Sequence, residues 1–103
     1  MADDKTKLLI IDDDPKVSWI LREGLQSGYD IITASDGIEG IQIASKEKPP
    51  LILLDIKMPG MSGLEVLKKL KKAELPSDVI MLSGQGETET VVEAVQLGAF
   101  FFI

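Results

Sequence analysis

Carboxylate and hydroxyl side chains follow three strongly apolar segments of the sequence. These side chains are Asp12 and Asp13 after residues 7–11, Asp55 after residues 51–54, and Ser83 after residues 78–82. Carboxylates that lie close together repel one another unless a cation neutralises them. A hard divalent ion such as Mg²⁺ (or Mn²⁺) is the natural counter-ion, because it binds carboxylate oxygens, waters and phosphate oxygens. An Asp carboxylate beside such an ion is also a competent nucleophile towards a phosphoryl group.

Composition limits the chemistry to carboxylates, hydroxyls, Lys and the backbone. The sequence has no His and no Cys, which removes the commonest general base and the thiolate metal ligands. Phosphoryl transfer tolerates this, since it depends mainly on positioning and charge neutralisation. The net charge of −6 argues against direct nucleic-acid binding; it suits an acidic metal site, although a solvated acidic surface is the alternative. With no apolar run of membrane-spanning length and no signal-peptide pattern, we expect a cytoplasmic protein without membrane contact.

Five segments with the composition of strands alternate with four helical segments. The apolar runs begin near residues 7, 29, 51, 78 and 99, and apolar residues recur at helical spacing between them. This alternation predicts a parallel sheet with helices on both faces, joined by right-handed crossovers. At 103 residues, the chain is predicted to be one α/β domain, residues 1–103. The carboxyl ends of the strands share one edge, where ligands bind in such sheets, so the polar residues above should share one pocket.

Each predicted helix has recognisable ends and an apolar face. The first begins at Pro15 with Asp14 as its N-cap, and the third begins at Ser62-Gly63. The positions expected to share a face or to face inward are Val17, Ile20, Leu21 and Leu25 in the first helix, Ile38, Ile41 and Ala44 in the second, and Leu64, Leu67 and Leu70 in the third. The sequence stops on its fifth apolar strand, and we expect a closing helix within roughly 20 further residues.

Four motifs, in this order and spacing, resemble the receiver domain of two-component response regulators. They are residues 9–15 (LIIDDDP), 53–63 (LLDIKMPGMSG), 79–84 (VIMLSG) and 97–100 (LGAF), so the resemblance covers the whole chain. The resemblance implies a doubly wound, flavodoxin-like α/β fold of five parallel strands in the order 2-1-3-4-5. Residues 83–86 (SGQG), followed by a Thr- and Glu-rich helix, look most like receivers attached to sigma-54-type activators.

The resemblance implies a phosphorylation site at the predicted pocket. Asp55 would accept a phosphoryl group from a histidine kinase or phosphotransfer protein. Asp12, Asp13, Asp55 and the backbone carbonyl of Lys57 would bind Mg²⁺. The family also has a Lys-Pro pair on its fifth strand, and that Lys would fall two residues past Ile103, so this contact to the phosphoryl group is expected outside the 103 residues.

The same resemblance implies how the site would act. The hydroxyl of Ser83 would turn towards the phosphoryl group, and Phe102 would move with it as the aromatic switch residue. Lys57 and Gln85 hold positions that tune the phosphoryl lifetime by controlling the attacking water. The domain would therefore be a switch and not an enzyme, acting on an output domain or downstream protein, with a phosphorylation-dependent homodimer as a further expected state.

Alternatives remain open for these residues. Taken singly, Asp12 could be a helix-capping acid, Asp55 a turn residue and Ser83 a loop hydroxyl without a role; their convergence favours a shared site. The main alternative function is a degenerate receiver that binds partners without phosphorylation, although such a domain would normally have lost an acid. A phosphohydrolase of the haloacid-dehalogenase type has two Asp at the spacing of Asp12 and Asp14, but Pro15 does not continue that motif.

Overall fold

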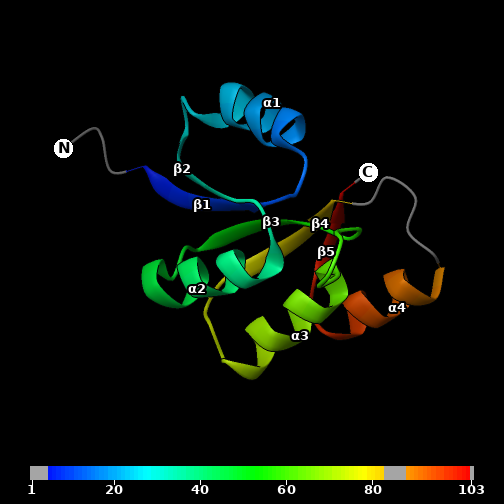
Figure 1. Cartoon of the computed structure of the whole chain (residues 1–103). Helices are drawn as coiled ribbons and strands as arrows, with labels where there is room; N and C mark the ends of the chain where they lie inside the picture. The colour runs from blue at the N-terminus through cyan, green and yellow to red at the C-terminus, as the bar shows by residue number, and fades with distance from the viewer. Residues whose placement is uncertain (1–4, 83–87, 103) are drawn as a thin grey trace.

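The computed structural model describes residues 5–82 and 88–102, which form a single parallel sheet with helices on both faces (Figure 1). The strands are β1 (Thr6–Ile11), β2 (Tyr29–Ala34), β3 (Leu51–Asp55), β4 (Asp78–Leu82) and β5 (Phe100–Phe102). The helices are α1 (Pro15–Leu25), α2 (Gly37–Glu47), α3 (Gly63–Lys72) and α4 (Thr88–Gln96). The strand order is β2-β1-β3-β4-β5, which confirms the predicted α/β fold and topology.

The register of the central strands brings the two acidic segments to the same level of the sheet. Ile11, the last residue of β1, pairs with Leu54 of β3. Asp12 and Asp55 are the next residue along each chain, so parallel pairing carries both to one edge of the sheet. On the other side of β3, Asp55 pairs with Leu82, the last residue of β4. Backbone pairing of the central strands therefore brings the predicted pocket residues to one edge of the sheet.

The two faces of the sheet are covered unequally. α1 lies on one face, and α2, α3 and α4 lie on the other (Figure 1). The larger buried cluster includes strand residues on the side of α2 and α3, namely Leu9, Ile11, Ile52, Leu54, Val79 and Met81, together with Ala44, Val66, Leu67 and Leu70 from those helices. The smaller buried cluster consists of Leu8, Ile10 and Leu53, with Leu21 and Leu25 of α1 packed partly against it. No residue of α1 is fully buried.

The prediction for the inward face of α2 was wrong at one position. Ala44 is buried, but Ile38 has 61% of its surface exposed. α2 approaches the sheet through its smallest residues, since the buried ones are Gly37, Gly40 and Ala44. A Cβ added to Gly40 would lie 2.5 Å from Cδ1 of Ile11. This close approach turns Ile38 towards solvent.

The predicted shared face of α1 agrees with the structure for three of its residues, because Ile20, Leu21 and Leu25 line one apolar groove beside α1. Leu21 and Leu25 pack partly on the sheet, whereas Ile20 is 62% exposed. Among residues 5–82 and 88–102, no helix is long and apolar enough to cross a membrane.

Candidate functional site

Asp12 and Asp13 lie at the junction between β1 and α1. The backbone N–H of Asp12 donates to the carbonyl of Ala34, with N and O 3.1 Å apart, which extends the pairing of β1 with β2 by one residue. The side chain of Asp12 is buried, with 5% of the residue exposed, and its Oδ1 accepts from the N–H of Asp14 at 2.8 Å. Asp14 caps α1, as predicted, by accepting from the N–H of Lys16 at 2.9 Å. The turn into α1 therefore fixes the Asp12 carboxylate.

Asp55 is the last residue of β3 and is half-buried. After it, the N–H of Ile56 still donates to the carbonyl of Leu82, at 3.4 Å. The N–H of Lys57 turns back and donates to Oδ1 of Asp55 at 3.3 Å. Asp55, the acceptor predicted from the sequence, thus lies between the last hydrogen bonds of the sheet and a tight turn.

The structure brings the three predicted acids together. One carboxylate oxygen from each of Asp12, Asp13 and Asp55 lies within 4.8 Å of the other two. Asp12 is buried, Asp13 is exposed and Asp55 is intermediate, so the cluster opens to solvent on one side. Three hard oxygen donors at this spacing fit a Mg²⁺-type ion, which takes one or two carboxylates and keeps several waters.

The electrostatics of the cluster favour protonation or cation binding. Burial, together with the neighbouring charge of Asp12, raises the pKa of Asp55 to about 6, against the opposing effect of the hydrogen bond from Lys57. Burial also raises the pKa of Asp12, despite the opposing hydrogen bond from Asp14. The charged forms are therefore held at a cost in free energy, which a bound divalent cation would offset.

Two other predicted site residues, Ser83 and Gln85, lie outside the described residues. The backbone of Phe102 belongs to β5 and pairs with Leu82, the residue directly before Ser83. Lys57 is exposed and follows Asp55 by two positions. The individual roles of all these residues stay predictions.

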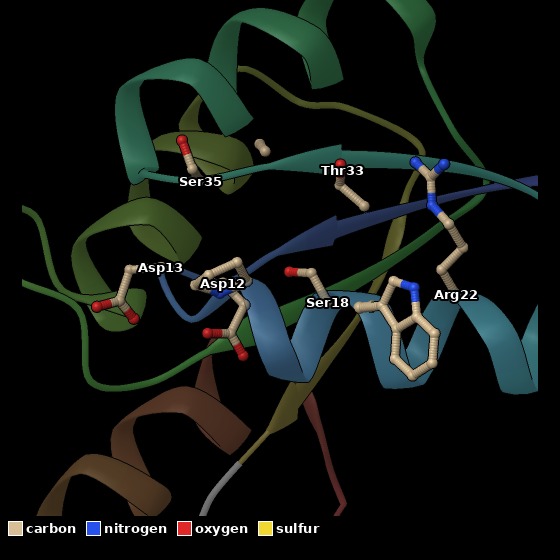
Figure 2. Close-up of a pocket in the computed structure, with 9 residues that line it drawn as sticks. Asp12, Asp13, Ser18, Arg22, Thr33 and Ser35 are labelled. Carbon is tan, nitrogen blue, oxygen red and sulfur yellow. The ribbon is translucent and has the colours of Figure 1, made fainter.

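A groove of about 490 Å³ adjoins the acids and was missed by the sequence reasoning. Asp12 and Asp13 line one part of it, and Ser18, Trp19 and Arg22 of α1 line another. Figure 2 shows Ser18 on α1 next to Asp12, and Arg22 extending from α1 towards the strand that carries Thr33. The helical spacing of Pro15, Ser18 and Arg22 was the available signal. The groove therefore lies directly beside two of the three acids of the cluster.

Comparison with known families decides the class of this domain. The family model described as "Response regulator receiver domain" matches residues 8–103. The chain belongs to this family. Receivers generally bind Mg²⁺ at an acidic pocket, and this receiver has an acidic cluster at the corresponding edge of its sheet. Response regulators work with histidine kinases and output domains as two-component systems.

Curated relatives of the receiver come from several response regulators. It is 42% identical over 94 residues to the alkaline phosphatase synthesis transcriptional regulatory protein PhoP of Bacillus subtilis, covering 90% of this chain and 39% of that protein. It is 38% identical over 94 residues to sporulation initiation phosphotransferase F of the same organism, and the match covers 90% of this chain and 76% of that protein. It is 34% identical over 104 residues to the transcriptional regulatory protein GlrR of Escherichia coli, and the match covers 100% of this chain and 23% of GlrR. The relatives thus include sigma-54-type activators, and the chain spans well under half the length of PhoP and GlrR.

Solved structures agree with the family and fold. A CheY-like response regulator receiver domain from Methanospirillum hungatei superposes with a TM-score of 0.90 at 32% identity, covering 97% of this chain and 81% of that one. A response regulator from Burkholderia pseudomallei superposes with a TM-score of 0.84 at 28% identity, covering 94% and 59%. That second structure was solved with a phosphorylated aspartic acid, a calcium ion and citrate.

Proposed function

We propose that this receiver is a phosphorylation-activated switch in which Asp55 accepts a phosphoryl group in a Mg²⁺-dependent reaction. The observation that carries the proposal is the approach of Asp12, Asp13 and Asp55 to within 4.8 Å at one edge of the sheet. With a pKa raised to about 6, the Asp55 carboxylate is more basic than an ordinary Asp and is still mostly ionised at neutral pH. It is the nucleophile best placed for the reaction.

The phosphorylated aspartic acid and calcium ion of the Burkholderia pseudomallei relative support this assignment. They show a member of the same family carrying the modification that we propose for Asp55. The name of sporulation initiation phosphotransferase F describes a relative that takes part in phosphoryl transfer. Because response regulators work with histidine kinases, we take a histidine kinase or phosphotransfer protein as the phosphoryl donor.

The transfer requires few groups from the protein. An Oδ atom of Asp55 forms a bond to phosphorus while the phosphorus–nitrogen bond of a phosphohistidine donor breaks, and the imidazole nitrogen keeps the electron pair. The carboxylates of Asp12, Asp13 and Asp55, with the backbone carbonyl of Lys57, would hold Mg²⁺. Once bound, the ion neutralises charge on the acids and on the phosphoryl oxygens. No His or Cys of this chain is needed, which agrees with their absence from the sequence.

The phosphoryl group would then bias the conformation of the domain. We assign Ser83 to donate a hydrogen bond to a phosphoryl oxygen, and Phe102 to follow it as the aromatic switch residue. Lys57 and Gln85 would set the phosphoryl lifetime. Phosphorylation shifts a pre-existing equilibrium, which an output domain or downstream protein would read, with homodimerisation as one such readout. The domain modifies only itself, so it is a switch and not an enzyme.

Intact mass measurement after incubation with Mg²⁺ and acetyl phosphate tests the proposal. We expect one added phosphoryl group on the unaltered protein and none on Asp55→Ala. Asp30→Ala is a matched control, because Asp30 is an exposed acid of β2 outside the cluster, and this variant should be modified normally. An adduct that persists in Asp55→Ala would contradict the assignment. No adduct on any variant would favour the degenerate receiver that binds partners without phosphorylation.

A further inference from the structure

The start of α3 lies directly against the backbone of the proposed acceptor residue. A Cβ built on Gly63 would lie 2.1 Å from the carbonyl oxygen of Asp55 and 2.7 Å from the Cα of Ile56. Real Cβ atoms essentially never approach that closely. Both neighbours are backbone atoms, so no side-chain rotation can relieve the overlap. Any side chain at position 63 must move either α3 or the end of β3.

Other glycines lack this property in the part of the chain that the structure describes. A Cβ on Gly37 or Gly40 would meet side-chain atoms, which can shift to a new rotamer. A Cβ on Gly24 would have no atom within 4 Å. The contact of Gly63 therefore depends on its place beside Asp55 and is not a general feature of helix starts.

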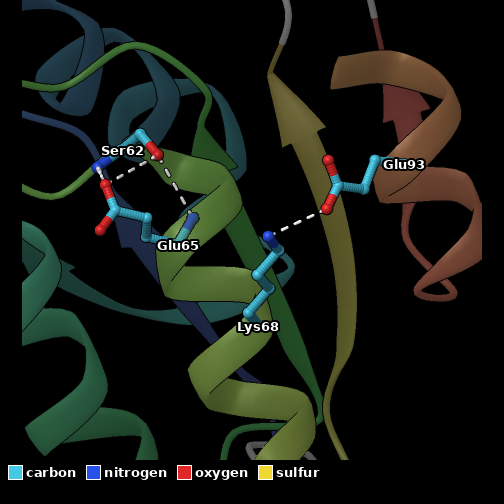
Figure 3. A network of polar contacts seen from close by, with 4 residues as sticks. All are labelled: Ser62, Glu65, Lys68 and Glu93. Carbon is cyan, nitrogen blue, oxygen red and sulfur yellow. Dashed lines mark hydrogen bonds and ion pairs between the residues drawn. The ribbon is translucent and has the colours of Figure 1, made fainter. Parts of the chain in front are cut away.

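Hydrogen bonds hold the same contact in place. The N–H of Gly63 donates to the carbonyl of Ile56 at 2.8 Å, which closes the loop between β3 and α3. The first turn of α3 is fixed by a capping box, in which Ser62 Oγ accepts from the N–H of Glu65 at 3.3 Å and Glu65 Oε1 accepts from the N–H of Ser62 at 3.2 Å (Figure 3). The loop is also anchored by Ile56 and Met58, which are 7% and 8% exposed.

The closed loop carries two of the proposed metal ligands. Asp55 begins it, and Lys57, whose carbonyl is the fourth proposed ligand, lies within it. The N–H of Lys57 also donates to the Asp55 carboxylate at 3.3 Å. Movement at Gly63 would therefore change the position of both ligands relative to Asp12 and Asp13, which lie at the junction between β1 and α1.

We propose that Gly63, supported by the Ser62–Glu65 capping box, is a positioning residue that sets the Asp55 carboxylate and the Lys57 carbonyl in the geometry for a divalent cation. This proposal rests on the proposed function for the identity of the ion. Gly63 touches neither the ion nor the phosphoryl donor, and it acts through the backbone of Asp55 and Ile56. Residues that orient metal ligands in this way typically affect metal affinity strongly.

The test is a Mg²⁺ titration of the unaltered protein and of Gly63→Ala, in which the fluorescence of Trp19 reports binding. Trp19 is the only Trp of the chain, and it lines the groove next to Asp12 and Asp13. We expect the half-saturating Mg²⁺ concentration to rise about tenfold. Two controls separate positioning from loss of stability. Leu70→Ala removes a buried side chain near the far end of α3, and Gly24→Ala makes the same chemical change in open space; both should keep the original affinity.

A second measurement needs neither metal nor phosphoryl donor. The ¹³C chemical shift of the Asp55 carboxyl carbon in metal-free protein should move in Gly63→Ala and stay unchanged in Leu70→Ala. If Gly63→Ala does not fold, Ser62→Ala takes its place. We expect Ser62→Ala to change the Mg²⁺ affinity and the Asp55 chemical shift in the same direction by a smaller amount, and Ser62→Thr to restore both. An unchanged Asp55 shift and unchanged Mg²⁺ affinity would overturn the positioning role while leaving acceptance of a phosphoryl group at Asp55 intact. If the unaltered protein is not phosphorylated at Asp55, only the proposed function is contradicted. The ¹³C chemical shift of the Asp55 carboxyl carbon still decides the positioning role of Gly63.

Discussion

The two faces of the sheet differ in how completely they are packed. On the face covered by α2 and α3, Leu9, Ile11, Ile52 and Leu54 have no exposed surface. On the face of α1, the buried cluster is limited to Leu8, Ile10 and Leu53. Beside α1 lies an apolar groove of about 450 Å³, which Leu8 and Leu53 help to line. The same strands therefore supply a dense core on one side and a partly open surface on the other.

This difference explains how the acidic cluster can be both fixed and accessible. Ile11 and Leu54, which directly precede the acids Asp12 and Asp55, both belong to the dense cluster. The ends of β1 and β3 are thus held by packing against α2 and α3. The groove next to Asp12 and Asp13 is formed with α1, the helix without a fully buried residue. Substitutions on the two faces should therefore have different consequences.

The largest effect is expected from neighbouring leucines of β3 that point to opposite faces. Leu54→Ala should destabilise the domain by about 4 kcal/mol, because Leu54 is completely buried and the dense face cannot collapse around the cavity. Leu53→Ala should cost about 2 kcal/mol, since Leu53 borders the open groove. Urea unfolding of both variants measures the difference, and equal costs would contradict the contrast between the faces.

Magnesium should stabilise the folded domain. If the three acids bind the ion only when folded, Mg²⁺ at 100 times its dissociation constant adds about 2.7 kcal/mol. Thermal unfolding with and without Mg²⁺, at constant ionic strength, measures this shift. Asp12→Asn should abolish it, whereas Asp30→Asn should leave it unchanged. A Mg²⁺ shift that survives in Asp12→Asn would place the ion elsewhere.

The metal-free domain should lose stability as the pH rises. The pKa of Asp55 is raised from 3.8 to about 6, mainly by burial, so the folded state binds more protons than the unfolded state between these values. Stability from this group is therefore present below about pH 4 and falls as the pH passes through about 6. Urea unfolding across this range should show the decline, and Asp55→Asn should reduce it. A rise in stability over the same interval would be the opposite of what burial predicts.

The smallest effect concerns the link between α3 and α4. Lys68 and Glu93 form an ion pair at 2.9 Å (Figure 3), with side-chain exposures of 52% and 46%. Such an exposed pair should contribute about 0.5 kcal/mol, measured by a double-mutant cycle with Lys68→Ala and Glu93→Ala. High salt should remove most of the coupling. A coupling that salt leaves unchanged would mean that packing, and not charge, joins the helices.

The sequence predicted the features that depend on local pattern. Apolar runs identified all the strands, and the acids at the ends of two of them met as parallel pairing requires. The N-cap Asp14 was recognisable because Asp before Pro is typical of a helix start. These predictions succeeded because strand composition and helix capping are properties of neighbouring residues.

The predictions that failed depend on distances between distant segments. The isoleucines of α2 suggested an inward face that includes Ile38, but Gly37, Gly40 and Ala44 allow a closer approach to Ile11. Hydrophobic periodicity favours large residues and does not detect a contact made by small ones. The contact between Gly63 and the Asp55 carbonyl was missed for the same reason, since only the folded chain shows two backbones that close together.

The most direct test of the central claim is to identify the phosphorylated residue chemically. Borohydride reduction converts an aspartyl phosphate into homoserine, which tandem mass spectrometry of peptides can locate. After treatment with acetyl phosphate, we predict homoserine at position 55 when Mg²⁺ is present, and none after chelation of the metal. Homoserine at position 12 or 13, or modification at position 55 that is independent of a divalent cation, would contradict the account.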